Sequence, residues 1–210
     1  YMPQDLPCAA PAPGERLPQT AYRLIAPFFD GDPLAHAVEA MCEEALDLDL
    51  PLVRPDPEQP RLFALELFHG PTGAFKDFGA RFLAAALSRL AEASGERLTV
   101  LAATSGDTGG AVGCAVEGRE RLAAGILFPK GRVSAFQRHQ LCCWAPPVQA
   151  FEVDGDFDAC QALVKTAFRN PDASARFGLT SANSINIARL LPQAAFLAHG
   201  AQAALDETGE

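Results

Sequence analysis

From residue 61 onward the chain alternates between strand-like and helix-like patterns, and this alternation most limits the folds open to it. Leucine and β-branched residues gather in strand-like runs in RLFALELF (61–68), at the start of RLTVLAATSGDTGGAVGCAV (97–116), in LAAGILFPKG (122–131) and in PVQAFEVDG (147–155). Each run is followed by apolar residues at the three- and four-residue spacing of a helix. A helix between two strands is the usual crossover of a parallel βαβ unit. The sequence therefore predicts an α/β fold of parallel βαβ units in a doubly wound sheet.

The first 60 residues differ from the rest because proline recurs through them. Residues 1–33 should form loops or short helices, since proline lacks a backbone donor. Apolar residues at helical spacing then run through DPLAHAVEAMCEEALDL, with Asp32 as a candidate N-cap and Pro33 at the first helical position. The proline-rich linker PLVRPDPEQP ends this region. We expect an N-terminal helical segment over residues 1–60.

Charge and composition argue against several classes of function. The net charge is −9 and the pI about 4.9, whereas a nucleic-acid-binding protein carries a clustered basic face. No apolar run is long enough to cross a bilayer. The cysteines form no C-x-x-C pair and the histidines no H-E-x-x-H spacing, so we expect no metal site. The sequence predicts a cytoplasmic protein that binds neither nucleic acid nor membrane.

A lysine stands among aromatic residues in the stretch HGPTGAFKDFGARF. Lys76 follows a Pro-Thr-Gly turn and precedes an apolar stripe at helical spacing, so it should lie at a helix N-terminus. The helix dipole disfavours a cation there, and Phe75 and Phe78 add apolar walls. Both effects favour the neutral amine that Schiff-base chemistry requires, while Asp77 suits the dipole and can stabilise the turn. Lys76 is therefore a candidate catalytic residue; a lysine lying along an apolar surface is the alternative.

The stretch ATSGDTGG joins a predicted strand to a predicted helix. A glycine-rich turn before a helix N-terminus presents backbone N–H groups to a carboxylate or phosphate. Thr104, Ser105 and Thr108 add hydroxyl groups, and Gly106 and Gly109 let the backbone approach a ligand closely. The stretch has neither the G-K-[ST] of a P-loop nor the G-x-G-x-x-G of a dinucleotide-binding turn. It predicts an anion site, with an ordinary tight turn as the alternative.

A polar cluster begins the last helical pattern, in the stretch TSANSINIARLLPQ. Asn183 and Ser184 are good N-cap residues, so helix capping alone can explain them. Arg189 adds charged donors, and with them the cluster can hold a phosphate. Lys130 and Arg132 follow a predicted strand in FPKGRVSAFQ and form a second basic source for an anion. A solvated loop is the alternative for these two residues.

In this order, these stretches resemble threonine synthase, a pyridoxal-phosphate enzyme of fold type II, the fold of the tryptophan synthase β subunit. ELFHGPTGAFKDFG is similar to the family's cofactor-lysine motif, and TSGDTG to its substrate loop. DGDFDACQALVK and SANSINIARLLPQ are similar to the long bacterial and fungal branch, and the resemblance covers nearly the whole chain. It implies an incomplete large domain formed by 61–96 and 178–210, and a small α/β domain over 97–177.

The resemblance also implies a role for each candidate residue. Lys76 would hold pyridoxal 5'-phosphate covalently and then carry protons between carbon atoms of the substrate. The substrate loop would bind the substrate through Thr104, Ser105 and Thr108, around its carboxylate, and would place Asp107 at the cofactor. The phosphate of O-phospho-L-homoserine would be held by Asn183, Ser184, Arg189 and Arg132, with Lys130 as the alternative to Arg132. The implied reaction converts this substrate and water to L-threonine and phosphate, in a monomer or homodimer.

Comparison with the family's pattern raises further expectations. The family's cofactor-phosphate loop would follow Glu210, and YMPQDLP resembles a segment some way into the long members, so we expect a chain shortened at both ends. We expect little or no turnover from this chain alone. Two other functions fit the same residues. One is a fold type II dehydratase or β-replacement enzyme acting on serine-like substrates, and the other is a non-catalytic homologue that binds a phosphorylated ligand.

Overall fold

The computed structural model describes residues 11–183 and 186–209. Its α-helices are α1 (Leu17–Ile25), α2 (Val38–Leu46), α3 (Lys76–Ser94), α4 (Asp107–Val116), α5 (Ala135–Cys142), α6 (Phe157–Arg169), α7 (Pro171–Phe177) and α8 (Ile187–Thr208). Its strands and 3₁₀ helices are β1 (Leu52–Val53), β2 (Ala64–Leu65), β3 (Leu98–Ala103), β4 (Leu122–Pro129), β5 (Val148–Val153), β6 (Leu179–Ser181), η1 (Ala26–Phe29) and η2 (Ala35–Ala37). Among the described residues, no helix has both the length and the apolar composition needed to cross a membrane.

The described residues form two compact units. Unit 1 consists of the residues up to Phe82 together with those from Ile187 onward, and unit 2 consists of Leu83–Asn186. The division falls within α3. The domain boundaries expected at residues 60, 96 and 177 stay a prediction.

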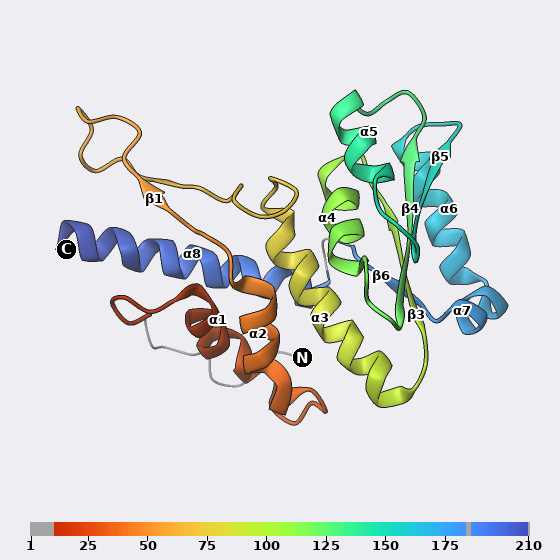
Figure 1. Cartoon of the computed structure of the whole chain (residues 1–210), viewed down its shortest axis with the longest axis horizontal. Helices are drawn as coiled ribbons and strands as arrows, with labels where there is room; N and C mark the ends of the chain where they lie inside the picture. The colour runs from red at the N-terminus through yellow and green to blue at the C-terminus, as the bar shows by residue number, and fades with distance from the viewer. Residues whose placement is uncertain (1–10, 184–185, 210) are drawn as a thin grey trace. The chain divides into compact units, whose positions relative to one another are not determined.

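Unit 2 contains a parallel sheet with helices on both faces (Figure 1). Its strands lie in the order β5-β4-β3-β6, and all neighbours are parallel. α4 packs on β4, while α6 lies on the other face against β3 and β4. Val100, Ala124 and Ile126 are buried in this sheet. The chain passes from the edge strand β5 to the opposite edge at β6, which confirms the predicted doubly wound arrangement of βαβ units.

The strand predicted over 61–68 is largely wrong. Only Ala64–Leu65 forms a strand, and it pairs antiparallel with Leu52–Val53, which lies in the stretch predicted as a linker. The apolar residues of this run are partly covered by side-chain contacts instead. A Cβ added to Gly200 of α8 would lie 2.8 Å from Leu65 Cδ2, and the Arg54 guanidinium lies 5.0 Å from the centre of the Phe63 ring. The pattern of apolar residues over 61–68 therefore indicated that their side chains are partly covered. It could not show whether a parallel strand lies beside this segment.

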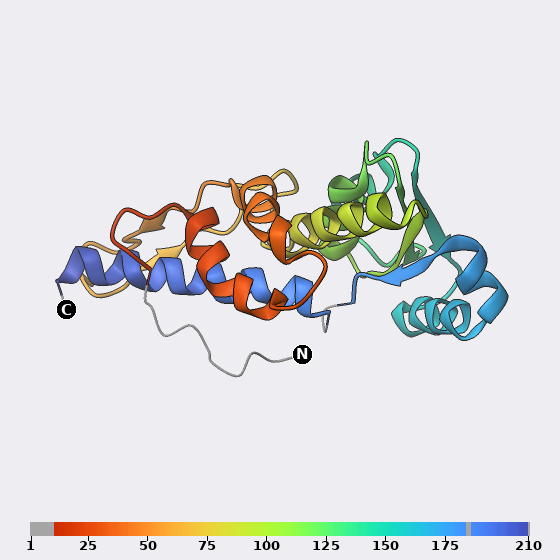
Figure 2. The same cartoon turned by 90° about the horizontal axis from the view of Figure 1, so that it is seen from below.

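Unit 1 is a helical assembly around α8, as Figure 2 shows from below. α1 packs against both α2 and α8, which is possible because each helix presents an apolar stripe. The Phe78 and Phe196 rings connect α3 to α8, with their centroids 5.2 Å apart. The fully or almost fully buried side chains of this core include Ala21, Ile25, Val38, Met41, Leu46, Phe78, Phe82 and Phe196. The N-terminal helical segment that the sequence predicted is thus present within the described residues.

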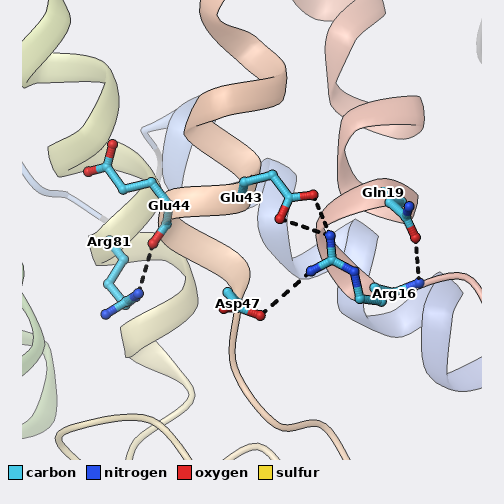
Figure 3. A network of polar contacts seen from close by, with 6 residues as sticks. All are labelled: Arg16, Gln19, Glu43, Glu44, Asp47 and Arg81. Carbon is cyan, nitrogen blue, oxygen red and sulfur yellow. Dashed lines mark hydrogen bonds and ion pairs between the residues drawn. The ribbon is translucent and has the colours of Figure 1, made fainter.

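Two arginines fasten α2 to its neighbours (Figure 3). Arg81 of α3 donates from Nε to the carbonyl oxygen of Ala45 and from Nη2 to that of Glu44, both at 2.8 Å. The last carbonyl oxygens of a helix receive no N–H group from within the helix. Arg81 supplies donors to two such oxygens of α2. Arg16, before α1, donates to both Glu43 carboxylate oxygens at 2.7 and 3.0 Å. The Arg16 pair is exposed and therefore contributes little, so Arg81 is the stronger link.

We expect Arg81→Met to lower the free energy of unfolding by about 1–2 kcal/mol, because methionine keeps the apolar stem and loses both hydrogen bonds. Arg97→Met is the matched control; Arg97 is exposed, and its replacement should change stability by less than about 0.5 kcal/mol. Urea unfolding followed by circular dichroism measures both. Equal losses for the two variants would contradict the capping role of Arg81.

His199 of α8 lies against α1. Its Nδ1 is 3.3 Å from the hydroxyl oxygen of Thr20, which is fully buried. Burial lowers the pKa of His199 from its ordinary value of 6.5, although the Glu15 carboxylate acts in the opposite direction. Glu15 is in turn paired with Arg23 at 2.6 Å. The folded protein therefore resists protonation of His199 more than the unfolded chain does.

This difference makes stability depend on pH. Below pH 6.5 the unfolded chain binds a proton at His199 more readily than the folded chain, so the stabilising contribution is lost as the pH falls toward 5. We expect His199→Gln to flatten the decline in unfolding free energy between pH 7 and pH 5, where the range follows from that ordinary pKa. The exposed His36→Gln should leave the decline unchanged. A decline as steep in His199→Gln as in the unmodified chain would refute this.

Candidate active site

Lys76 is the first residue of α3, as the sequence predicted. It follows a turn in which Gly73 has a φ of +69°, a conformation that glycine adopts without steric cost. The side chain is partly exposed, and its Nζ lies 3.5 Å from the centre of the Phe75 ring. Phe78, the other predicted aromatic neighbour, is fully buried and packs against Phe196. The amine is thus held at a helix N-terminus over one aromatic face.

The turn before Lys76 is fixed by a buried carboxylate. Asp77 is 1% exposed; its Oδ2 accepts the backbone N–H of Thr72 at 2.9 Å, and its Oδ1 accepts the Thr72 hydroxyl at 2.7 Å. Desolvation raises the pKa of Asp77, although its bonds with Thr72 act against the shift. A Cβ at Gly70 would lie 2.5 Å from Asp77 Oδ2, so only glycine leaves room for the carboxylate. Asp77 therefore stabilises the turn, the role that the sequence suggested for it.

α3 and α8 approach each other closely one turn after Lys76. A Cβ added to Gly79 would lie 2.8 Å from the backbone oxygen of Arg189. Arg189 itself is 3% exposed, and desolvation lowers its pKa. A buried guanidinium is a strong site for an anion, because the low dielectric that penalises its charge also strengthens its attraction to a phosphate. Unit 1 thus brings the helix that begins with Lys76 against the start of the helix that carries Arg189.

In unit 2, the glycine-rich turn between β3 and α4 is organised by Thr104. Thr104 is 2% exposed, and its Oγ1 accepts the backbone N–H groups of Gly106 and Gly109, each at 3.0 Å. The same hydroxyl donates to the Gly106 carbonyl at 2.9 Å. Ser105 and Asp107 are exposed and Thr108 is partly exposed. Thr104 thus shapes the turn, and the side chains of the other three predicted residues are wholly or partly exposed.

Close packing explains one glycine of this turn. A Cβ at Gly109 would collide with Leu141 of α5 and would lie 2.6 Å from Thr104 Cγ2 and 2.8 Å from Ile126 Cγ2. Glycine at this position therefore lets α4 lie close to β4 and α5. Its role in the described structure is helix packing, in addition to any approach to a ligand that the sequence suggested.

The other predicted phosphate ligands of unit 2 lie on two turns. Lys130 and Arg132 are exposed on the turn after β4, where the Arg132 N–H donates to the Pro129 carbonyl at 3.2 Å and Gly131 has a φ of +68°. Asn183 is exposed after β6, and its backbone N–H donates to the Ser181 hydroxyl at 3.1 Å. Ser184, predicted beside it, lies outside the described residues. Each turn places its polar groups where a small ligand can reach them.

Gln137 of α5 is a polar residue of this region that the sequence analysis missed. Its Nε2 donates to Asp107 Oδ1 at 3.2 Å, across 30 positions of the chain. The S-x-x-Q pattern from Ser134 to Gln137 is typical of a helix capping box, and the structure contains that box. The pattern could have located the start of α5, but no local signal indicates the contact with Asp107.

Each unit carries its own groups for chemistry on an anionic substrate. In unit 1, Lys76 offers a nucleophile and proton carrier, since the amine of a lysine can alternate between its two protonation states, and Arg189 offers charge for a phosphate. In unit 2, Arg132 offers charge for a phosphate, and the α4 N-terminus offers backbone donors to an anion. The residues of unit 1 therefore fit a cofactor that a lysine holds through its carbonyl carbon.

We expect Thr72→Val to lower the free energy of unfolding by about 1–2 kcal/mol, because the buried Asp77 carboxylate loses a hydroxyl donor while the side chain keeps its shape. Thr166→Val on the exposed surface of α6 is the matched control, with an expected change below about 0.5 kcal/mol. Chemical unfolding gives both values, and hydrogen–deuterium exchange should be faster over residues 70–76 in the first variant only. Unchanged exchange there would show that Asp77 does not hold the turn.

Comparison with known proteins gives a consistent picture. No family model matches the sequence. The threonine synthase of Haemophilus influenzae is 42% identical over 180 residues, which cover 86% of this chain and 41% of that protein. The threonine synthase of Escherichia coli is 51% identical over 129 residues, which cover 61% of this chain and 30% of that protein. The chain thus spans less than half the length of these curated relatives.

The fold agrees with the sequence comparison. The crystal structure of pyridoxal-phosphate-bound threonine synthase from Brucella melitensis superposes with a TM-score of 0.79 at 36% identity, covering 97% of this chain and 44% of that one. The α/β architecture is therefore that of fold type II, with the parallel sheet of unit 2 as its clearest element. In sequence and in fold, this chain belongs to the threonine synthase family.

Proposed function

We propose that this chain forms part of an enzyme that converts O-phospho-L-homoserine and water to L-threonine and phosphate, with pyridoxal 5'-phosphate as cofactor. The observation that carries the proposal is the position of Lys76. It is the first residue of α3, on a turn fixed by a buried carboxylate, in a chain that is 42% identical to a threonine synthase over most of its length. The activity is proposed for the family fold as a whole, of which this chain spans less than half.

Lys76 is the residue proposed to hold the cofactor and to move protons. When bound, pyridoxal phosphate supplies an electron sink that stabilises negative charge on carbon. The Lys76 amine can then take a proton from one carbon atom of the substrate and return it to another, which requires that it reach the neutral form. The helix dipole at this position disfavours a cation, whereas the Phe75 ring 3.5 Å from the amine nitrogen favours one.

Arg189 and Arg132 are proposed to bind the phosphate group of the substrate. The departing phosphate gains negative charge at the bridging oxygen, and fixed cations stabilise this charge as it develops. Arg189 is buried and held against α3 by its backbone, whereas Arg132 is exposed on a turn. Asn183 and Ser184 are proposed as neutral donors to the same phosphate, and Lys130 is the alternative to Arg132.

The turn after β3 is proposed to bind the carboxylate of the substrate. Ser105 and Thr108 present hydroxyl groups, and the α4 N-terminus presents backbone N–H groups and the positive end of a dipole. Asp107 is proposed to face the cofactor. Thr104 is proposed to act through the shape of the turn, since its hydroxyl is engaged with the backbone of the turn.

Selective labelling tests the role of Lys76. The chain contains three lysines: Lys76, Lys130 and Lys165. After incubation with pyridoxal phosphate and reduction with borohydride, peptide mass spectrometry should find the pyridoxyl group on Lys76 at an occupancy about tenfold above that on either other lysine, because only Lys76 lies at the proposed cofactor site. Lys76→Ala should abolish this label, while Lys165→Ala serves as the matched control and should keep it.

Equal labelling of the three lysines would overturn the assignment of Lys76. The substrate class is tested separately in a protein that joins this segment to the rest of the family fold. Phosphate release from O-phospho-L-homoserine with threonine formation is expected, and Lys76→Ala should remove it. Turnover of serine that does not depend on Arg189 or Arg132 would favour a dehydratase or β-replacement enzyme instead.

A further inference from the structure

We propose that Gln137 is a positioning residue that joins the turn at 104–108 to the turn at 130–134 in unit 2. The inference rests on the proposed function in one respect, namely that both turns bind anionic groups of the substrate. We call this link between the two turns the tether; it consists of hydrogen bonds and packing contacts of Gln137 within unit 2.

Both the oxygen and the nitrogen of the Gln137 side-chain amide form hydrogen bonds. Its Oε1 accepts the backbone N–H of Ser134 at 3.2 Å, while its Nε2 donates to Asp107 Oδ1 at 3.2 Å. Its own backbone N–H donates to the Ser134 hydroxyl at 3.1 Å, which completes the capping box of α5. Because Oε1 faces a donor, Nε2 must face Asp107, and the amide has one favourable orientation. The side chain therefore links the start of α5 to the start of α4.

Packing at Gly106 supports the same contact independently. A Cβ at Gly106 would collide with the Gln137 side-chain amide and would lie 2.8 Å from its Cδ. Any other residue at 106 would therefore displace Gln137 or the turn. Gly106 thus leaves room for the side chain of Gln137 in α5, which is 31 positions later in the chain.

The tether contacts Asp107 directly and holds the segment that follows Arg132, and both residues are proposed to bind ligands. Asp107 begins α4, and Ser134 lies two residues after Arg132. Arg132 is exposed, and its turn is closed by a hydrogen bond from its own N–H to the Pro129 carbonyl. Gln137 therefore fixes both Asp107 and the segment that follows Arg132, so that the two turns are held at a set separation. Preorganisation of this kind lowers the cost of ordering a site when ligand binds.

A negative charge introduced at position 137 distinguishes the proposed link to Asp107 from helix capping alone. A glutamate at position 137 has the same shape and would still accept the Ser134 N–H, so the capping box would remain. It would, however, place its second carboxylate oxygen against Asp107 Oδ1, where the amide now donates a hydrogen bond. Two like charges at this distance repel each other. Gln137→Glu thus breaks the tether and keeps the helix start, and adding Asp107→Asn should restore a donor–acceptor pair with the roles exchanged.

Hydrogen–deuterium exchange of the chain tests the proposal. In Gln137→Glu we expect backbone amides over 104–109 and 130–134 to exchange about fivefold faster, because a charged hydrogen bond becomes a repulsion. Amides over 138–142 in α5 should exchange at an unchanged rate. The double variant Gln137→Glu with Asp107→Asn should return both turns to within about twofold of the unmodified chain.

Three outcomes would overturn the tether: no change over 104–109 in Gln137→Glu, an equal acceleration over 138–142, or no recovery in the double variant. Inorganic phosphate separates this proposal from the proposed function. It should slow exchange at both turns of the unmodified chain, and slow it less in Gln137→Glu. If phosphate protects neither turn of the unmodified chain, their anion-binding role is refuted, while the exchange pattern of the variants still decides the tether.

Discussion

α3 and α8 meet at Gly79 with no room for a side chain between them, and the local arrangement in unit 1 depends on this contact. The backbone oxygen of Arg189 occupies the space that a Cβ at Gly79 would need, and the Phe78 and Phe196 rings pack beside it. Such close packing is specific because neither helix can shift without overlap or an empty gap. Lys76 lies one turn before this contact. The helix core and Asp77 therefore fix the turn and the helix start from which Lys76 extends.

Unit 2 uses polar side chains in two different ways. Thr104 and Gln137 bond to backbone groups and to Asp107, and so give the turns their shape. Ser105 and Arg132 are exposed and have no such role in the described structure. Buried polar groups must be satisfied within the fold, whereas exposed ones can exchange water for a ligand at little cost. This difference separates the buried Thr104 from the exposed Ser105 and Arg132, while the half-buried Gln137 uses its amide for hydrogen bonds within the fold.

Membership of the threonine synthase family and the local geometry support the same chemistry from separate directions. Identity with relatives extends over most of the chain, yet the chain spans less than half of their length. The geometry adds what identity alone does not state: an amine over the Phe75 ring at a helix N-terminus, and an arginine buried in the same unit. A site of this kind works by placing one amine and a few fixed charges, so small shifts of the supporting turns should affect it strongly.

The sequence by itself determined the parallel strands β3, β4 and β5 and the start of α3 at Lys76. These features depend on neighbours a few positions apart, and the period of apolar residues records them directly. Only the tertiary structure decided that 61–68 forms a short antiparallel pair, that Thr104 is buried within its turn, and that Gln137 reaches Asp107. Those contacts join residues that are distant in the chain or depend on burial, and the same local pattern is compatible with several such partners. Packing and the need to satisfy buried polar groups select one of them.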